Sequence, residues 1–153
     1  MTTQQPGKPN GPSRSQIVAM AREWLGTPYV HQASAKGQGA DCLGLVRGVW
    51  RELYGTEPAP VPAYTPDWAE QRGDEPLQRA AATHLVPAEG IALPGMVLLF
   101  RVVPGGPAKH LGILTDENRF LHAYAGRAVS ESWLSSWWQS RLAGHFDFPW
   151  VTA

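Results

Sequence analysis

Apolar residues recur with the period of an α-helix in two segments near the N-terminus. The first segment runs from about Ser15 to Leu25, and Gly26 follows it as a stop signal. Its predicted inward-facing residues are Ile17, Met20, Ala21, Trp24 and Leu25. The second segment, ADCLGLVRGVWRELYG, runs from Ala40 to Gly55. Its apolar stripe consists of Cys42, Leu45, Val46, Val49, Trp50 and Leu53. We expect both segments to form helices that bury these stripes.

The C-terminal half carries the shorter apolar runs and turn residues of strands. After the Pro94–Gly95 turn, MVLLFRVV (Met96–Val103) is nearly all apolar, which predicts a central strand. KHLGILTDENRFLHAY (Lys109–Tyr124) predicts a hairpin with a polar turn at Asp116, Glu117 and Asn118. Further strands are expected at Arg127–Glu131 and His145–Val151. Helices followed by mostly antiparallel strands indicate an α+β fold.

Three other segments have weaker patterns. TEPAPVPAYTPDW, with four prolines, predicts an extended and stiff surface segment. A short helix is expected from Asp74, as N-cap, to about His84. SWLSSWWQSRL has Trp133, Leu134, Trp137, Trp138 and Leu142 at helical spacing. We expect Trp133 and Trp137 to pack in the core with Trp138 at its rim. The alternative is an exposed Trp137–Trp138 surface for a ligand or partner.

Composition limits the class of protein. The 153 residues are predicted to form a flexible tail, 1–12, and a single domain, 13–153. Thirteen basic and thirteen acidic residues cancel without any basic run, which argues against nucleic acid as a partner. No apolar run is long enough to insert in a membrane, and the N-terminus lacks a signal core, so synthesis in the cytoplasm is expected. A single cysteine excludes an internal disulfide.

That cysteine, Cys42, stands at the first turn of the second predicted helix. Asp41 is a suitable N-cap and Gly55 a stop signal for this helix. The unpaired backbone N–H groups at a helix N-terminus favour a thiolate over a thiol. Asp41 opposes this effect unless capping hydrogen bonds occupy its carboxylate. Cys42 is therefore a candidate nucleophile, although a lone cysteine is more often a small buried apolar residue.

The predicted hairpin supplies a candidate base. Folding it about Asp116 places His110 opposite His122, so the two imidazoles share one face of the sheet. Together with Cys42 they form a nucleophile, a base and a residue that orients the base. A register slip of one residue would separate them, and either histidine alone would be interpreted as a packing residue. His31, His84 and His145 have no comparable spacing and are expected in surface or packing roles.

The chain resembles the NlpC family of cell-wall cysteine peptidases, which have a papain-like fold. The resemblance covers about Gln16 to Ala125 and rests on short motifs in the family's order. These motifs are WLGTPY (Trp24–Tyr29), DCLGLV (Asp41–Val46), Pro94–Gly95, KHLGIL (Lys109–Leu114) and FLHAY (Phe120–Tyr124). Members cleave peptide bonds in peptidoglycan stem peptides without a cofactor or metal.

The resemblance implies a role for each matching residue. Cys42 corresponds to the nucleophile, His110 to the general base and His122 to the residue that orients it. Tyr29 corresponds to a tyrosine of the substrate cleft, and its hydroxyl would join the backbone N–H of Cys42 in binding the oxyanion. Leu43 stands where members usually carry serine, and His31–Gln32–Ala33 replaces the usual Gly-Gly, which affects the expected substrate preference.

Within the family, the pattern is most similar to the versions of phage tails and gene transfer agents. The tracts DCLGLVRGVWRELYG, DEPLQRAAATHL and SSWWQSRL carry this similarity. It implies tail or baseplate proteins as partners, and delivery in a phage-like particle that opens the wall locally, at the wall or in the periplasm.

Three other functions use the same residues. The chain could be a catalytically silent tail component or wall-binding module that kept the fold. Cys42, His110 and His122 could instead bind zinc, although no short ligand spacing supports this. Finally, the same thiol chemistry could serve an amidase or transferase acting on a substrate outside the wall.

Overall fold

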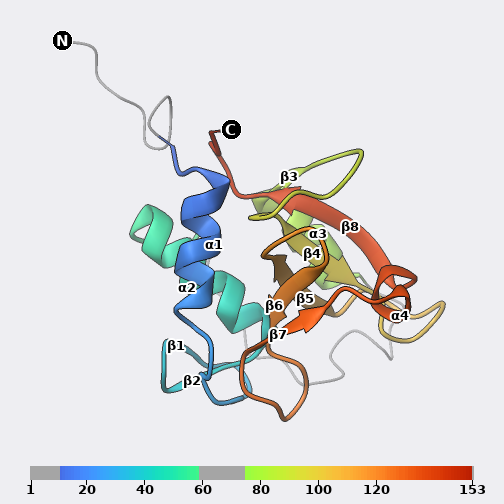
Figure 1. Cartoon of the computed structure of the whole chain (residues 1–153), viewed down its shortest axis with the longest axis horizontal. Coiled ribbons are helices and arrows are strands. Elements are labelled where there is room, and N and C mark those ends of the chain that lie inside the picture. Colours follow the sequence, from blue (N-terminus) through green and yellow to red (C-terminus); the bar gives the residue numbers. More distant parts are fainter. Residues whose placement is uncertain (1–10, 59–74, 153) are drawn as a thin grey trace.

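Helices α1 (Arg14–Arg22) and α2 (Cys42–Tyr54) pack together over a six-stranded sheet, as the computed structural model of the chain shows (Figure 1). The structure describes residues 11–58 and 75–152. The other helices are α3 (Pro76–His84) and α4 (Ser136–Gln139). The strands are β1 (Ser34–Ala35), β2 (Gly39–Ala40), β3 (Val86–Pro87), β4 (Val97–Phe100), β5 (His110–Leu114), β6 (Arg119–His122), β7 (Ser130–Trp133) and β8 (Leu142–Asp147).

The six strands are antiparallel and lie in the order β3-β8-β4-β5-β6-β7. Strand β4 lies inside the sheet, and all of its residues are buried, as the apolar run Met96–Val103 predicted. Strands β1 and β2 form a separate small hairpin just before α2. The α+β fold class predicted from the sequence is therefore confirmed.

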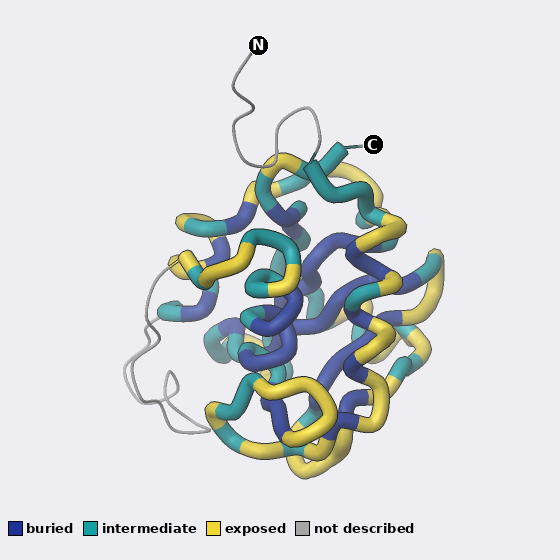
Figure 2. Tube along the Cα trace, turned by 90° about the vertical axis from the view of Figure 1, so that its left-hand side faces the viewer, coloured by how far each residue is buried: buried dark blue, intermediate teal, exposed yellow. Residues whose placement is uncertain are grey.

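Each face of the sheet carries an apolar cluster, because successive strand residues point to opposite faces. Val97 and Leu99 of β4 join the larger cluster with α1 and α2. Leu98 and Phe100 join a smaller one with Leu114 and Phe120, and Trp138 packs against it. The buried segments run through the middle of the molecule and the exposed ones through the loops (Figure 2). Among the described residues, no helix is long and apolar enough to cross a membrane.

The two helices predicted near the N-terminus are present, with somewhat different boundaries. Helix α2 has Asp41 as N-cap and ends at Gly55, whose φ of 84° suits glycine. Helix α1 ends at Arg22, so the expectation that Leu25 faces inward is wrong, and this side chain is 45% exposed. Residues 1–10 of the predicted tail lie outside the described residues, and Gly11 and Pro12 accept hydrogen bonds from Thr152.

Two predictions concern residues of segment 59–74, which the structure does not describe. Helix α3 begins at Pro76 and has Glu75 as its N-cap, while Asp74, the predicted cap, lies outside the described residues. The proline-rich segment beyond Pro58 lies outside them as well.

Two of the three C-terminal tryptophans contradict the expected packing. Trp133 ends strand β7 and is 68% exposed, and Trp137 is 45% exposed. The helical spacing does not apply to Trp133, because only the four residues Ser136–Gln139 form α4. Trp138 is half-buried and packs against the smaller cluster, as expected for a residue at the rim of the core. The predicted strands also shift, to Ser130–Trp133 and Leu142–Asp147.

Candidate active site

The N-terminus of α2 is fixed by Asp41, as predicted. One carboxylate oxygen accepts a hydrogen bond from the backbone N–H of Gly44 at 2.7 Å. The other accepts from the backbone N–H of Gln32 at 2.8 Å. Because Asp41 joins the preceding loop to the first turn of α2, it sets the position of Cys42, the first residue of the helix.

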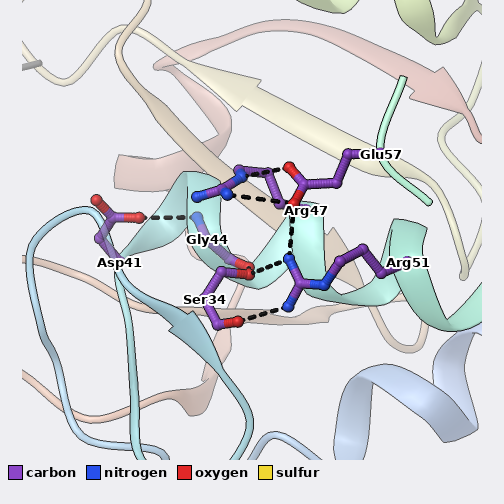
Figure 3. A network of polar contacts seen from close by, with 6 residues as sticks. All are labelled: Ser34, Asp41, Gly44, Arg47, Arg51 and Glu57. Carbon is purple, nitrogen blue, oxygen red and sulfur yellow. Dashed lines mark hydrogen bonds and ion pairs between the residues drawn. The ribbon is translucent and has the colours of Figure 1, made fainter. Parts of the chain in front are cut away.

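A polar network holds the β1–β2 hairpin against the same turn (Figure 3). The hydroxyl of Ser34 donates to the carbonyl oxygen of Gly44 at 2.6 Å and accepts from Arg51 at 2.9 Å. Arg51 also donates to the carbonyl oxygen of Ser34. Glu57 accepts from Arg47 at 2.6 Å and from Arg51 at 3.1 Å, and these hydrogen bonds and charges lower the pKa of Glu57.

The Cys42 thiol is half-buried and donates to the carbonyl oxygen of Lys109 at 3.9 Å. Burial, and secondly the charge of Asp41, raise the pKa of this thiol to about 12, while the backbone amides of Leu111, Leu43 and Cys42 itself act in the opposite direction. The expected thiolate is therefore wrong for the resting structure. Capping hydrogen bonds on Asp41 do not remove its effect.

His110 and His122 form a hydrogen-bonded pair on neighbouring strands. Nε2 of His110 lies 2.8 Å from Nδ1 of His122. Only 5% of His110 and 3% of His122 are exposed. Burial, with a smaller effect of His122, lowers the pKa of His110 well below its usual value, and burial lowers the pKa of His122 to about 4. Both rings are therefore neutral at neutral pH.

The register of this hairpin differs from the prediction by two residues. Ile113 pairs with Leu121 and Leu114 with Phe120, and the backbone N–H of Thr115 donates to the carbonyl oxygen of Arg119. The hairpin therefore turns about Glu117 rather than Asp116, and continuing the register sets Gly112, not His110, beside His122. A shift of two keeps the same face, so the two histidines still meet, along a diagonal.

Aromatic side chains surround the pair. The ring centroid of Trp138 lies 5.4 Å from that of His110 and 5.2 Å from that of His122. Phe100, Phe120 and Tyr124 also contact one or both imidazoles. Sequence spacing did not reveal Trp138 as a neighbour of this site, since it reaches the pair from a separate short helix.

A serine hydroxyl lies within hydrogen-bonding distance of the second histidine. The Oγ atom of Ser132, in β7, lies 2.8 Å from Nε2 of His122. The sequence offered no signal for Ser132, because its role depends on the register between β6 and β7, which sets Ser132 opposite Phe120.

Tyr29 and Leu43, the remaining predicted site residues, flank Cys42. Tyr29 is half-buried, and its pKa is raised first by burial and then by the charges of Cys42 and Asp41. Leu43 is half-buried and packs against the larger apolar cluster. Among the other histidines, His31 lies 3.7 Å from Asp41, and His145 donates to the carbonyl oxygen of Gly90 at 3.0 Å.

The structure thus brings the two histidines together and sets the thiol against the backbone next to His110. The hydrogen bond of the thiol is to Lys109, not to an imidazole. Within residues 11–58 and 75–152, no group of three His, Cys, Asp or Glu side chains could hold a metal ion. These residues therefore offer no ligand set for the zinc site considered above, since Nε2 of His110 and Nδ1 of His122 are hydrogen-bonded to each other.

Comparisons with known proteins point to one family. The model of the NlpC/P60 family matches residues 26–146. γ-DL-Glutamyl hydrolase of Bacillus subtilis is 31% identical over 129 residues, which are 84% of this chain and 28% of that protein. Murein DD-endopeptidase MepS/murein LD-carboxypeptidase of Escherichia coli is 28% identical over 129 residues, 84% of this chain and 59% of that protein. The chain thus spans under two thirds of both relatives.

A solved structure supports the fold. The crystal structure of an NlpC/P60 family protein from Bacillus cereus matches with a TM-score of 0.64 at 16% identity, covering 92% of this chain and 41% of that one. The NlpC-type fold expected from the sequence motifs is therefore confirmed.

Proposed function

The chain belongs to the NlpC/P60 family, and on this premise we propose that it is a cysteine peptidase that hydrolyses peptide bonds in peptidoglycan stem peptides. The observation that carries the proposal is the buried pair of His110 in β5 and His122 in β6, joined at 2.8 Å, with the Cys42 thiol against the carbonyl oxygen of Lys109 just before β5. The names of two relatives, a γ-DL-glutamyl hydrolase and a murein endopeptidase, support this class of substrate.

In the proposed reaction, Cys42 attacks the scissile carbonyl carbon while its proton passes to His110. Nε2 of His110 is bonded to His122, so Nδ1 is the nitrogen that accepts the proton. The backbone N–H of Cys42 and the Tyr29 hydroxyl bind the oxyanion. His110 then protonates the leaving amine as the C–N bond breaks. Water, activated by His110, hydrolyses the thioester and returns the thiol.

The resting electrostatics favour proton transfer during attack over a preformed ion pair. Because the pKa of Cys42 is raised and the pKa of His110 is lowered, both side chains are neutral at neutral pH before substrate binds. Binding of a substrate carbonyl would turn the thiol from Lys109 toward the imidazole. Catalytic hydrogen bonds commonly tighten in this way only when substrate is bound.

Digestion of purified peptidoglycan tests the proposal. Wild-type protein should release new amine termini, and mass spectrometry of the muropeptides should identify the bond. Cys42→Ala should lose nearly all activity, and His122→Asn should lose less than His110→Gln, since His122 orients and does not transfer the proton. His84→Gln, at the end of α3, is the control and should keep wild-type activity. A Cys42→Ala variant as active as wild type would falsify the mechanism.

A second candidate is a catalytically silent wall-binding module with the same fold. The observation that favours it is the neutral thiol bonded to Lys109 rather than to His110. Such a module would sediment with purified walls and release no amine termini. Release that depends on Cys42 excludes it.

We further propose delivery of the enzyme by a phage-like particle, with tail or baseplate proteins as partners. The three tracts named above support this, and α2 includes most of the first one. If it is right, antibodies against the chain should detect it in particles purified from producing cells by density-gradient centrifugation. Particles without the chain would contradict this proposal and leave the peptidase proposal standing.

A further inference from the structure

We propose that Ser132 is a positioning residue, which accepts the hydrogen bond that the Nε2–H tautomer of His122 needs and thereby supports the base form of His110. The inference rests on the proposed peptidase function for its catalytic meaning. The geometry itself is independent of that function: Ser132 Oγ, His122 and His110 form one continuous chain of hydrogen bonds with two links of 2.8 Å each.

Only one direction of this chain makes His110 a base. To accept a proton at Nδ1, neutral His110 must carry its own proton on Nε2 and donate it to Nδ1 of His122. His122 must then carry its proton on Nε2, and this N–H needs an acceptor. Ser132 Oγ is 2.8 Å away and supplies that acceptor. If Ser132 instead donates to Nε2 of His122, both imidazoles carry their proton on Nδ1. Nδ1 of His110 can then accept no further proton.

The charged state that forms during attack has the same requirement. When His110 accepts the thiol proton it becomes an imidazolium and can only donate at Nε2. His122 must accept this hydrogen bond at Nδ1, so its proton again lies on Nε2, facing Ser132. Ser132 therefore stabilises the state of the pair that accompanies the developing thiolate. The burial of both rings strengthens the requirement, because an unpaired N–H is costly there.

Contacts on several sides hold Ser132 in place although β7 is an edge strand. Its backbone pairs with β6, opposite Phe120. The neighbouring Glu131 accepts from Thr115 at 2.7 Å and from Arg22 of α1 at 3.0 Å. Beyond the strand, Leu134 donates through its backbone N–H to the carbonyl oxygen of Asn118 at 2.6 Å. Strand β7 is thus held around Ser132 by β6, by Thr115 just after β5 and by Arg22 of α1.

Three variants separate a hydroxyl effect from a general effect on β7. Ser132→Ala removes the acceptor, and Ser132→Thr keeps a hydroxyl on a residue type suited to strands. Ser130→Ala is the matched control: Ser130 lies directly opposite His122 in the register but is exposed. We expect kcat/KM on peptidoglycan fragments to fall about tenfold in Ser132→Ala, to recover in Ser132→Thr and to stay unchanged in Ser130→Ala.

Long-range ¹H–¹⁵N correlation spectra of ¹⁵N-histidine-labelled protein supply a readout that needs no activity. Wild type and Ser132→Thr should show His122 protonated on Nε2, and Ser132→Ala should shift the tautomer populations of both histidines. Unchanged populations in Ser132→Ala would overturn the inference, even if activity fell. If wild type hydrolyses nothing, the proposed function fails, while the spectra still decide the role of Ser132.

Discussion

At the scale of single residues, Cys42 shows that two opposing effects compete at a helix N-terminus. The dipole and amides of a helix end contribute about 1 kcal/mol in favour of a negative charge. Burial of an ionisable group can shift its pKa by several units in the opposite sense. For Cys42, burial and the charge of Asp41 together outweigh the amides, and the pKa rises to about 12. The cysteine is thus held at rest as a neutral thiol.

Asp41→Asn tests the contribution of the carboxylate to this state. Asparagine is an equally good N-cap, and its side-chain oxygen can still accept from Gly44, while its NH₂ group cannot accept the second hydrogen bond, from Gln32. Loss of the negative charge should lower the pKa of Cys42, so we expect iodoacetamide to alkylate the variant several-fold faster at pH 7. Glu52→Gln, which removes an exposed carboxylate from the same helix, should react at the wild-type rate. An Asp41→Asn rate no higher than wild type, with unchanged circular dichroism, contradicts the assignment.

At the scale of elements, the close approach of one loop to α2 depends on a glycine. A Cβ built on Gly44 would lie 1.8 Å from the carbonyl oxygen of Ala33. The loop that supplies the second hydrogen bond of Asp41 can therefore contact the helix only if residue 44 has no side chain. The hydrogen bonds of Ser34 with Gly44 and Arg51 also hold this loop against α2.

Gly44→Ala should destabilise the protein despite the higher helix propensity of alanine. The propensity gain is about 1 kcal/mol, while forcing an atom against backbone costs about 3 kcal/mol. We expect the free energy of unfolding in urea to fall by about 2 kcal/mol. Gly144→Ala is a matched control, since its Cβ would meet only the Phe146 ring, at 3.5 Å. Equal stability of the two variants would show that the loop yields easily.

The elements also show what the sequence could and could not predict. Apolar period and capping residues predicted α2, and the polar turn predicted the hairpin with both histidines on one face. The pivot of the turn was misjudged by one residue, which moved the pairing by two and left the face intact. Trp138 and Ser132 could not be predicted, because each reaches the histidines through contacts between distant segments. The protonation of Cys42 depends on burial, which local pattern does not measure.

At the scale of the whole molecule, two buried neutral histidines make the stability of the fold depend on pH. His110 in β5 and His122 in β6 lie against Trp138, and only 5% and 3% of these residues are exposed. A charge placed on either ring would be poorly solvated, so folding favours their neutral forms. This burial makes the folded state sensitive to acid.

The free energy of unfolding should therefore fall as the pH drops from 6.5 to 4.5. Both histidines have lower pKa values in the folded protein than the 6.5 of an unperturbed histidine, so the unfolded chain binds protons first and is stabilised. Each unit of pH costs up to about 1.4 kcal/mol per histidine, which predicts a loss of about 2 kcal/mol or more across this range. Glu57, Glu75 and Glu131, whose pKa values are lowered below 4.5, lose their ion pairs only at still lower pH. Urea unfolding at several pH values measures the slope, and the double variant His110→Gln/His122→Gln should flatten it. A slope that persists in the double variant would assign the acid sensitivity to other groups.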